Sequence, residues 1–204
     1  MTLYDLKPAF QARLRPYVDR LAEKGVTANQ VTLAASAISV LVGLLVMAAE
    51  VRPLFLLIPL WLGLRMAFNA ADGMLAREHG QKSRLGAFFN ELGDVVSDAF
   101  LYAPFAILPA FGPGLVAFVV LLAILTEFAG VLAQALGASR RYDGPLGKSD
   151  RALVFGVIGT WVGFGGPLPD WSALALWAVA ILLVVTIVKR VRAALAEMPV
   201  RAGE

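Results

Sequence analysis

The chain has 204 residues, of which 59% are hydrophobic and only 16% are charged, whereas soluble domains are about half apolar and about a quarter charged. This composition excludes an ordinary soluble domain and a disordered chain, and it predicts an all-α integral membrane protein. With no cysteine and one histidine, disulfides, thiol catalysis and multi-histidine metal centres are excluded. The net charge of +3 is small and gives no reason to expect a nucleic-acid partner.

Residues 1–30 form a charged juxtamembrane segment without a continuous apolar run. Apolar residues such as Phe10, Leu14 and Val18 recur at helical steps, with basic residues between them. This pattern predicts an amphipathic helix on the cytosolic membrane surface. Pro8 and Pro16 are expected to break or kink that helix.

Six apolar stretches follow, most of them near the roughly 20 residues that a bilayer requires. They cover residues 31–49, 54–77, 85–111, 115–137, 152–164 and 171–188. Turn signals rich in glycine and proline separate several of them. We therefore predict six transmembrane helices in one membrane domain over residues 31–188, followed by a cytosolic basic tail over residues 189–204.

The distribution of lysine and arginine predicts the orientation of these helices. Of the 18 basic residues, 16 lie in residues 1–30, 77–84, 138–151 and 189–204, which alternate with the other connections. Because positively charged loops stay in the cytoplasm, we expect both termini there. The protein is predicted to be a multi-pass protein of a bacterial inner membrane.

Five acidic residues lie inside the apolar stretches, where a charge costs a few kcal/mol. These residues are Asp72, Glu91, Asp94, Asp98 and Glu127. A single acid such as Glu127 is explained equally well by helix packing. The clustering of the others favours a functional site near the cytosolic ends of the second and third stretches. Arg65 is predicted to pair with an intramembrane acid, and Glu127 is one candidate.

Helical spacing brings oxygen-bearing side chains onto shared faces. Asn69 and Asp72 share one face of the second stretch, whereas Asn90, Asp94 and Asp98 follow one another at single turns in the third. Oxygen ligands without histidine or cysteine favour Mg²⁺ or Mn²⁺. A divalent ion beside basic residues at the membrane–cytosol boundary suits a phosphate ester as substrate.

The residues Asn69-x-x-Asp72-Gly73-x-x-Ala76-Arg77, eight residues, and Gly86-x-x-x-Asn90-x-x-x-Asp94 carry a family resemblance. They closely resemble the signature D-x-x-D-G-x-x-A-R-x8-G-x-x-x-D-x-x-x-D of the CDP-alcohol phosphotransferases. The approach to the first stretch, from Thr27 to Thr32, resembles the T-P-N-x-x-T element of that family. The amphipathic segment and six stretches also agree, so the resemblance covers nearly the whole chain.

The resemblance implies a phospholipid-synthesis transferase that moves a phosphatidyl group from CDP-diacylglycerol or a similar CDP-alcohol to an acceptor alcohol and releases CMP. It implies a metal-dependent site on the cytoplasmic side, with Asp94 as the general base, and a homodimer. The implied metal ligands, with neighbouring acids that could compensate, are Asn69, Asp72, Asn90, Asp94, Glu91 and Asp98. The implied CDP-binding residues are Asn29, Thr32, Asp72, Gly73, Ala76, Arg77 and Gly86.

Two positions depart from the signature. Asn69 and Asn90 stand where the family has its first and third aspartates, so two negative charges are missing. An amide oxygen can still bind a hard cation, but at least one ion of a two-metal centre should bind more weakly. Glu91 and Asp98 are candidates to supply charge. The substitutions also leave open a catalytically altered relative that only binds lipid or metal.

The basic connection over residues 138–151 has two interpretations. Its cations satisfy the positive-inside rule and can contact anionic membrane lipids. Alternatively they bind a phosphorylated or anionic acceptor alcohol, in which case the candidates are Arg140, Arg141, Lys148 and Arg151. A small transporter would also explain intramembrane acids, but it does not explain the spacing from Asp72 to Arg77.

Overall fold

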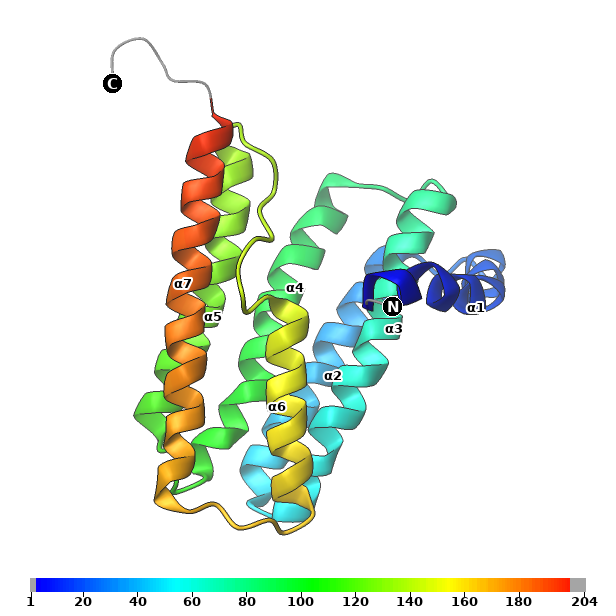
Figure 1. Cartoon of the computed structure of the whole chain (residues 1–204). Coiled ribbons are helices and arrows are strands. Elements are labelled where there is room, and N and C mark those ends of the chain that lie inside the picture. The colour runs from blue at the N-terminus through cyan, green and yellow to red at the C-terminus, as the bar shows by residue number, and fades with distance from the viewer. Residues whose placement is uncertain (1–2, 199–204) are drawn as a thin grey trace.

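The computed structural model describes residues 3–198, which form seven α-helices and three short 3₁₀-helices. Figure 1 shows α2 to α7 in one bundle, with α1 lying across it. The bounds are α1 (Leu3–Glu23), α2 (Ala28–Ala49), η1 (Arg52–Leu56), α3 (Leu57–Glu78), α4 (Arg84–Tyr102), η2 (Ala103–Ile107), α5 (Pro113–Ala135), α6 (Lys148–Gly163), η3 (Asp170–Ser172) and α7 (Ala173–Glu197).

In the bundle, α2 and α4 pack on each other near the centre. α2 packs on both α3 and α4, α5 packs on both α4 and α7, and α6 packs on α3. α3 ends and α4 begins at one end of the bundle, and the α5–α6 connection and the last turns of α7 lie at the same end (Figure 1). We call this the α3–α4 end.

The opposite half of the bundle is held by an aromatic core. Phe105 of η2 lies edge-on to Phe55 of η1 and to Phe155 of α6, with ring centroids 5.3 and 5.1 Å apart. The ring of Tyr102 stacks on Phe155 at 3.9 Å. These four side chains are almost completely buried. This half is apolar, and the buried charged side chains lie in the half towards the α3–α4 end. They are Arg65, Asp72, Asp98, Glu127, Arg151 and Arg190.

The structure agrees with an all-α integral membrane protein. Within the described residues, four segments are long and apolar enough to cross a membrane: α2, η1–α3, α5 and η3–α7. Of the other two predicted spans, α6 has only 16 residues and α4 carries the charged cluster. Many large apolar side chains on the outside of the bundle are exposed, as a surface that faces lipid requires.

Three sequence expectations about helix boundaries were wrong. The third stretch is not one helix to Phe111, because α4 ends at Tyr102 and η2 follows; Pro104 cannot continue the α-helical hydrogen bonds. α7 continues to Glu197, nine residues beyond the predicted end at Val188. α1 passes through Pro8 and Pro16 without a break.

α1 is attached to the end of α3 by one buried side chain and two polar contacts. Val18 is 1% exposed and packs with Met74 and Leu75. Arg15 donates two hydrogen bonds to the carboxylate of Glu78 at 3.0 and 3.2 Å, which raises the pKa of the arginine. The contacts fix α1 beside the α3–α4 end.

Close packing of α2 on α4 generates a testable prediction. A Cβ atom at Gly43 would meet the backbone carbonyl of Phe100 in α4, whereas a Cβ at Gly63 in α3 would meet nothing within 4 Å. Gly43→Ala should therefore lower the free energy of unfolding by about 1–3 kcal/mol through overpacking. Gly63→Ala is the matched control. Equal thermal unfolding midpoints for the two variants in detergent would contradict this packing.

Candidate active site

The N-terminus of α2 begins the site. The hydroxyl of Thr27 accepts from the backbone N–H of Gln30, and the side-chain oxygen of Gln30 accepts from the N–H of Thr27. This capping box fixes where α2 starts. One turn further, Thr32 donates its hydroxyl to the carboxylate of Asp72 at 2.7 Å. The resemblance placed Thr32 and Asp72 in the same CDP site, and the structure brings them into contact.

Two glycines of the signature permit close approach. A Cβ at Gly86 would lie 2.6 Å from the side-chain oxygen of Asn29, so glycine lets the Asn29 side chain lie directly against the start of α4. A Cβ at Gly73 would lie 2.9 Å from the guanidinium of Arg77, so the arginine side chain folds back over the glycine. Ala76, on the next turn, is half-buried. The signature thus has a packing basis in all three helices.

Asp94 is held by two cations from other helices. Lys148 at the start of α6 lies 2.5 Å from its Oδ1 atom, and Arg65 of α3 donates to the same atom at 2.9 Å. The Asp94 side chain is 25% exposed and that of Lys148 is 29% exposed, whereas Arg65 is buried. Asp94 therefore lies where a buried arginine and a solvent-accessible lysine converge.

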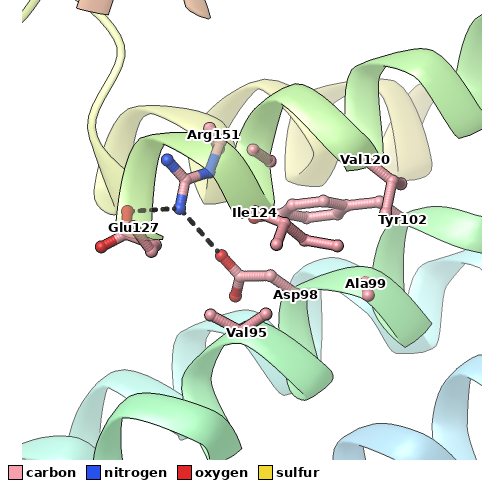
Figure 2. Close-up of a pocket in the computed structure, with 9 residues that line it drawn as sticks. Val95, Asp98, Ala99, Tyr102, Val120, Ile124, Glu127 and Arg151 are labelled. Carbon is pink, nitrogen blue, oxygen red and sulfur yellow. Dashed lines mark hydrogen bonds and ion pairs between the residues drawn. The ribbon is translucent and has the colours of Figure 1, made fainter. Parts of the chain in front are cut away.

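A deeper layer of ion pairs lies behind Asp94. Asp98, one turn further along α4, accepts from Arg65 at 2.5 Å and from Arg151 at 3.2 Å. Arg151 also donates to Glu127 at 2.9 Å, so one guanidinium bridges α4 and α5 (Figure 2). Arg65 and Arg151 are 4% and 1% exposed. Charges at this depth require such partners.

Arg65 pairs with intramembrane acids, as predicted, but the candidate partner Glu127 is wrong. Arg65 pairs with Asp94 and Asp98 on α4, the helix that carries both acids one turn apart. Glu127 on α5 instead has three arginines within 3.5 Å. These are Arg140, Arg151 and Arg190.

Glu91 is also paired. Arg140 donates to both of its carboxylate oxygens, at 2.8 and 2.6 Å. This bidentate geometry is the strong form of an arginine–carboxylate contact. The charge of Glu91, which the sequence offered as compensation for Asn90, therefore faces Arg140 in this structure.

Arg141 belongs to a separate cluster at the outside of the same end. It donates to Asp143 at 2.8 Å and to Glu197 at 2.7 Å. The hydrogen bond from Arg141 holds the pKa of the Asp143 carboxyl below its ordinary value. These contacts tie the α5–α6 connection to the end of α7 and do not reach Asp94.

The predicted metal ligands fall into two groups. Glu91, Asp94 and Asp98 are each bound by arginine or lysine side chains. Asp72, by contrast, is in no ion pair within residues 3–198. It lies three residues after half-buried Asn69 on α3, towards the α3–α4 end. Asn90 is exposed. In the same range, no three His, Cys, Asp or Glu side chains lie close enough together to hold an ion. Among the predicted ligands, Asp72 is thus the carboxylate without a paired lysine or arginine within residues 3–198.

Sequence reasoning missed Arg190 as a site residue. It was assigned to a cytosolic tail, yet it is 1% exposed and donates to the backbone carbonyls of Thr126 and Asp143. The buried face of α7 runs through Leu183, Thr186 and Arg190 at helical steps. Extending that periodicity past the apolar stretch would have predicted its burial.

The fold and the site define a helical membrane protein with a charged site at one end of its bundle. The site contains the signature residues from Asn69 to Asp94. The family model for CDP-alcohol phosphatidyltransferase matches residues 25–188, and the chain belongs to this family. It is therefore a member of a family of phospholipid-synthesis transferases.

Individual relatives agree with the assignment. The chain is 52% identical to the inner membrane protein YnbA of Escherichia coli K12, over 96% of this chain and 97% of the relative. It is 29% identical to the phosphatidylinositol phosphate synthase of Mycolicibacterium smegmatis, over 92% of this chain and 86% of that enzyme.

Solved structures show the same fold. The Mycobacterium tuberculosis phosphatidylinositol phosphate synthase with CDP-DAG bound superposes with a TM-score of 0.72 at 22% identity, covering 88% of this chain and 92% of that one. The same enzyme in complex with manganese and citrate gives 0.71 at 21% identity, with 88% of each chain covered.

The buried ion pairs generate a prediction about stability. Arg151→Gln would leave Asp98 and Glu127 without their shared cation, which should cost about 3–5 kcal/mol of unfolding free energy. Arg141→Gln is a matched control, because this arginine also bridges two carboxylates but does so near the surface, where pairs contribute little. Thermal unfolding in detergent would measure both. A smaller loss for Arg151→Gln than for Arg141→Gln would contradict the buried network.

Proposed function

We propose that the chain is a membrane-embedded transferase that uses CDP-diacylglycerol or a similar CDP-alcohol, transfers its substituted phosphate to an acceptor alcohol and releases CMP. The observation that carries this is the assembly of the signature residues of α2, α3 and α4 at the α3–α4 end, beside Asp94. The CDP-DAG bound by the structural neighbour supports the choice of lipid substrate.

The proposed topology has six spans, with both termini and the site in the cytoplasm. The basic segments gather at the α3–α4 end, as positive-inside orientation requires. α4 and α6 cross with the others because they share the bundle with α2, α3 and α5 (Figure 1). The inner membrane relative in Escherichia coli supports this location.

Single cysteines can test this topology, because the chain has none. Lys82→Cys and Ser139→Cys should be protected from a membrane-impermeant maleimide in intact cells, whereas Pro109→Cys and Asp170→Cys should be labelled. All four positions are exposed, so labelling after permeabilisation is the control. Each neighbouring pair brackets α4, α5 or α6. Protection of Pro109→Cys in intact cells would show that α4 does not cross.

The proposed CDP site lies among α2, α3 and the start of α4. Asn29 and Thr32 approach from α2, Asp72 and Arg77 from α3. Arg77, exposed and folded over Gly73, can neutralise a phosphate without losing a buried partner. Gly73 and Gly86 let the side chains of Arg77 and Asn29 lie close against the helices, where we propose that they contact the diphosphate. Ala76 is the third small residue of the proposed site.

In the proposed reaction, the acceptor hydroxyl oxygen attacks the phosphorus attached to the lipid alcohol. The bond from that phosphorus to the CMP oxygen breaks, CMP leaves, and Asp94 receives the hydroxyl proton. Arg65 fixes the Asp94 carboxylate from the buried side. Lys148 is the partner on the solvent side, and it can move to an entering substrate.

Asp72 and Asn69 are the residues that we propose to hold a Mg²⁺ or Mn²⁺ ion, since no ion pair within the described residues occupies Asp72. A bound divalent ion would neutralise diphosphate charge. The missing carboxylates at positions 69 and 90 imply that a second ion binds weakly, or only together with the substrate diphosphate. A relative solved with manganese supports this choice of ion.

We also propose a homodimer. Gly130, which the sequence suggested as a contact between copies, is buried under the guanidinium of Arg140. A dimer would therefore use other parts of the exposed apolar surface.

Substitution of the two acids tests the proposed chemistry. Asp72→Asn and Asp94→Asn should each lower CMP release by at least about 100-fold. The first substitution removes the carboxylate proposed to hold the metal ion, and the second removes the proposed general base. The assay is CMP release from CDP-diacylglycerol with Mn²⁺ and a pool of alcohols. Asp170→Asn at the opposite end is the control.

Two outcomes would contradict this assignment. Full activity of both variants would show that the centre is placed wrongly. If the unmodified protein releases no CMP with any alcohol, the non-catalytic lipid- or metal-binding alternative holds.

A further inference from the structure

The cations near Asp94 form a cluster that already contains its own anion. Glu127 of α5 accepts from Arg151 at 2.9 Å and from Arg140 at 3.3 Å, and Arg190 lies 3.5 Å from it. The three arginines come from α6, the α5–α6 connection and α7. Three guanidinium groups around one point are the arrangement that proteins use to bind a phosphate. Here a carboxylate of the chain occupies that point.

The charges around this point are nearly balanced. The cations of the cluster are Arg65, Arg140, Lys148, Arg151 and Arg190, and the carboxylates paired with them are Glu91, Asp94, Asp98 and Glu127. Five positive groups therefore face four negative ones. Of the cations, only Lys148 has a substantially exposed side chain. A phosphate ester would add about two negative charges.

Entry of such a group would be costly because Glu127 is 9% exposed. A phosphate that took over its arginines would leave a buried carboxylate without a counter-ion, which costs several kcal/mol. A phosphate that left the arginines in place would meet Asp94 and the CDP diphosphate with one lysine to neutralise it. Neither arrangement favours an anionic acceptor.

The cluster does retain hydrogen-bond donors. Within the part of the chain that the structure describes, Nη1 of Arg140, Nε of Arg151 and the hydroxyl of Tyr102 are buried without a partner. Arg151 and Tyr102 line a cavity of about 10 Å³ together with Asp98 and Glu127 (Figure 2). A cavity of this size holds about one water molecule, so a phosphate group cannot reach these donors unless the side chains around them move.

We propose that Glu127 is an internal counter-ion that determines acceptor specificity, so that the acceptor is an uncharged polyhydroxy alcohol rather than a phosphorylated one. This rests on the proposed transferase function. It also narrows the acceptor site expected from the sequence. Lys148 reaches the acceptor, whereas Arg140 and Arg151 act through the hydrogen-bonded cluster and Arg141 lies outside it. Glu127 is a positioning residue, because its carboxylate contacts the three arginines and the hydroxyl of Thr126.

Acceptors in matched pairs test the proposal. We expect the unmodified protein to release CMP from CDP-diacylglycerol with a kcat/KM at least about tenfold higher for glycerol or inositol than for their monophosphates. Glu127→Gln should release the arginines and shift this ratio towards the phosphorylated member by at least about tenfold. Glu127→Asp keeps the charge and should keep the preference. Glu197→Gln, which removes a carboxylate from the surface cluster at the same end, should not change the ratio.

A binding measurement separates this proposal from the catalytic one. Titration of the purified protein with inorganic phosphate should show a Kd weaker than about 1 mM for the unmodified chain and at least about tenfold tighter binding for Glu127→Gln. Preference of the unmodified protein for phosphorylated acceptors, or tight phosphate binding without substitution, would overturn the counter-ion role. An absence of CMP release with every acceptor would refute the transferase, while the phosphate titration would still decide the role of Glu127.

Discussion

The requirement that every charge inside an apolar bundle has a partner determines the site. A carboxylate or guanidinium far from water costs several kcal/mol unless an opposite charge and hydrogen bonds compensate it. Here the compensation is internal: Arg65 of α3 serves two acids of α4, and Arg151 of α6 joins α4 to α5. The helices that contribute to the site are therefore also held together by it. Beyond it, packing is apolar and aromatic.

Much of this arrangement could be predicted from the sequence because it depends on local periodicity. Asp94 and Asp98 are one turn apart, so they necessarily share a face of α4, and the signature spacing anticipated the contact between Thr32 and Asp72. Helix ends were predicted less well. The end of α4 depends on Pro104, which the apolar composition of the stretch obscured. α1 continues through Pro16, and the side chain of Pro16 is exposed.

Partner choice between helices could not be predicted. The sequence indicates that Arg65 needs an acid, but which one depends on whether α4 or α5 lies beside α3, and both Asp98 and Glu127 are buried acids paired with arginine. Arg190 was overlooked because it follows an apolar stretch. The positive-inside rule counts such a residue only as evidence for a cytosolic tail. The packing of α7 on α5 buries Arg190, as the helical periodicity through Leu183 and Thr186 would have indicated.

The two asparagines are best understood together with the counter-ions. In a centre made of four carboxylates, bound cations balance the charge; here positions 69 and 90 are neutral amides, and the remaining acid of the second signature half, Asp94, is balanced by Lys148 and Arg65. The acids of α4 are balanced by side chains from α3, α6 and the α5–α6 connection: Arg65 of α3 pairs with Asp94 and Asp98, and Arg140 and Arg151 pair with Glu91 and Asp98. Asp72 differs, because within the described residues its carboxylate accepts a hydrogen bond from Thr32 and is in no ion pair. The ion that we propose at Asp72 would therefore join a site whose other acids already have counter-ions.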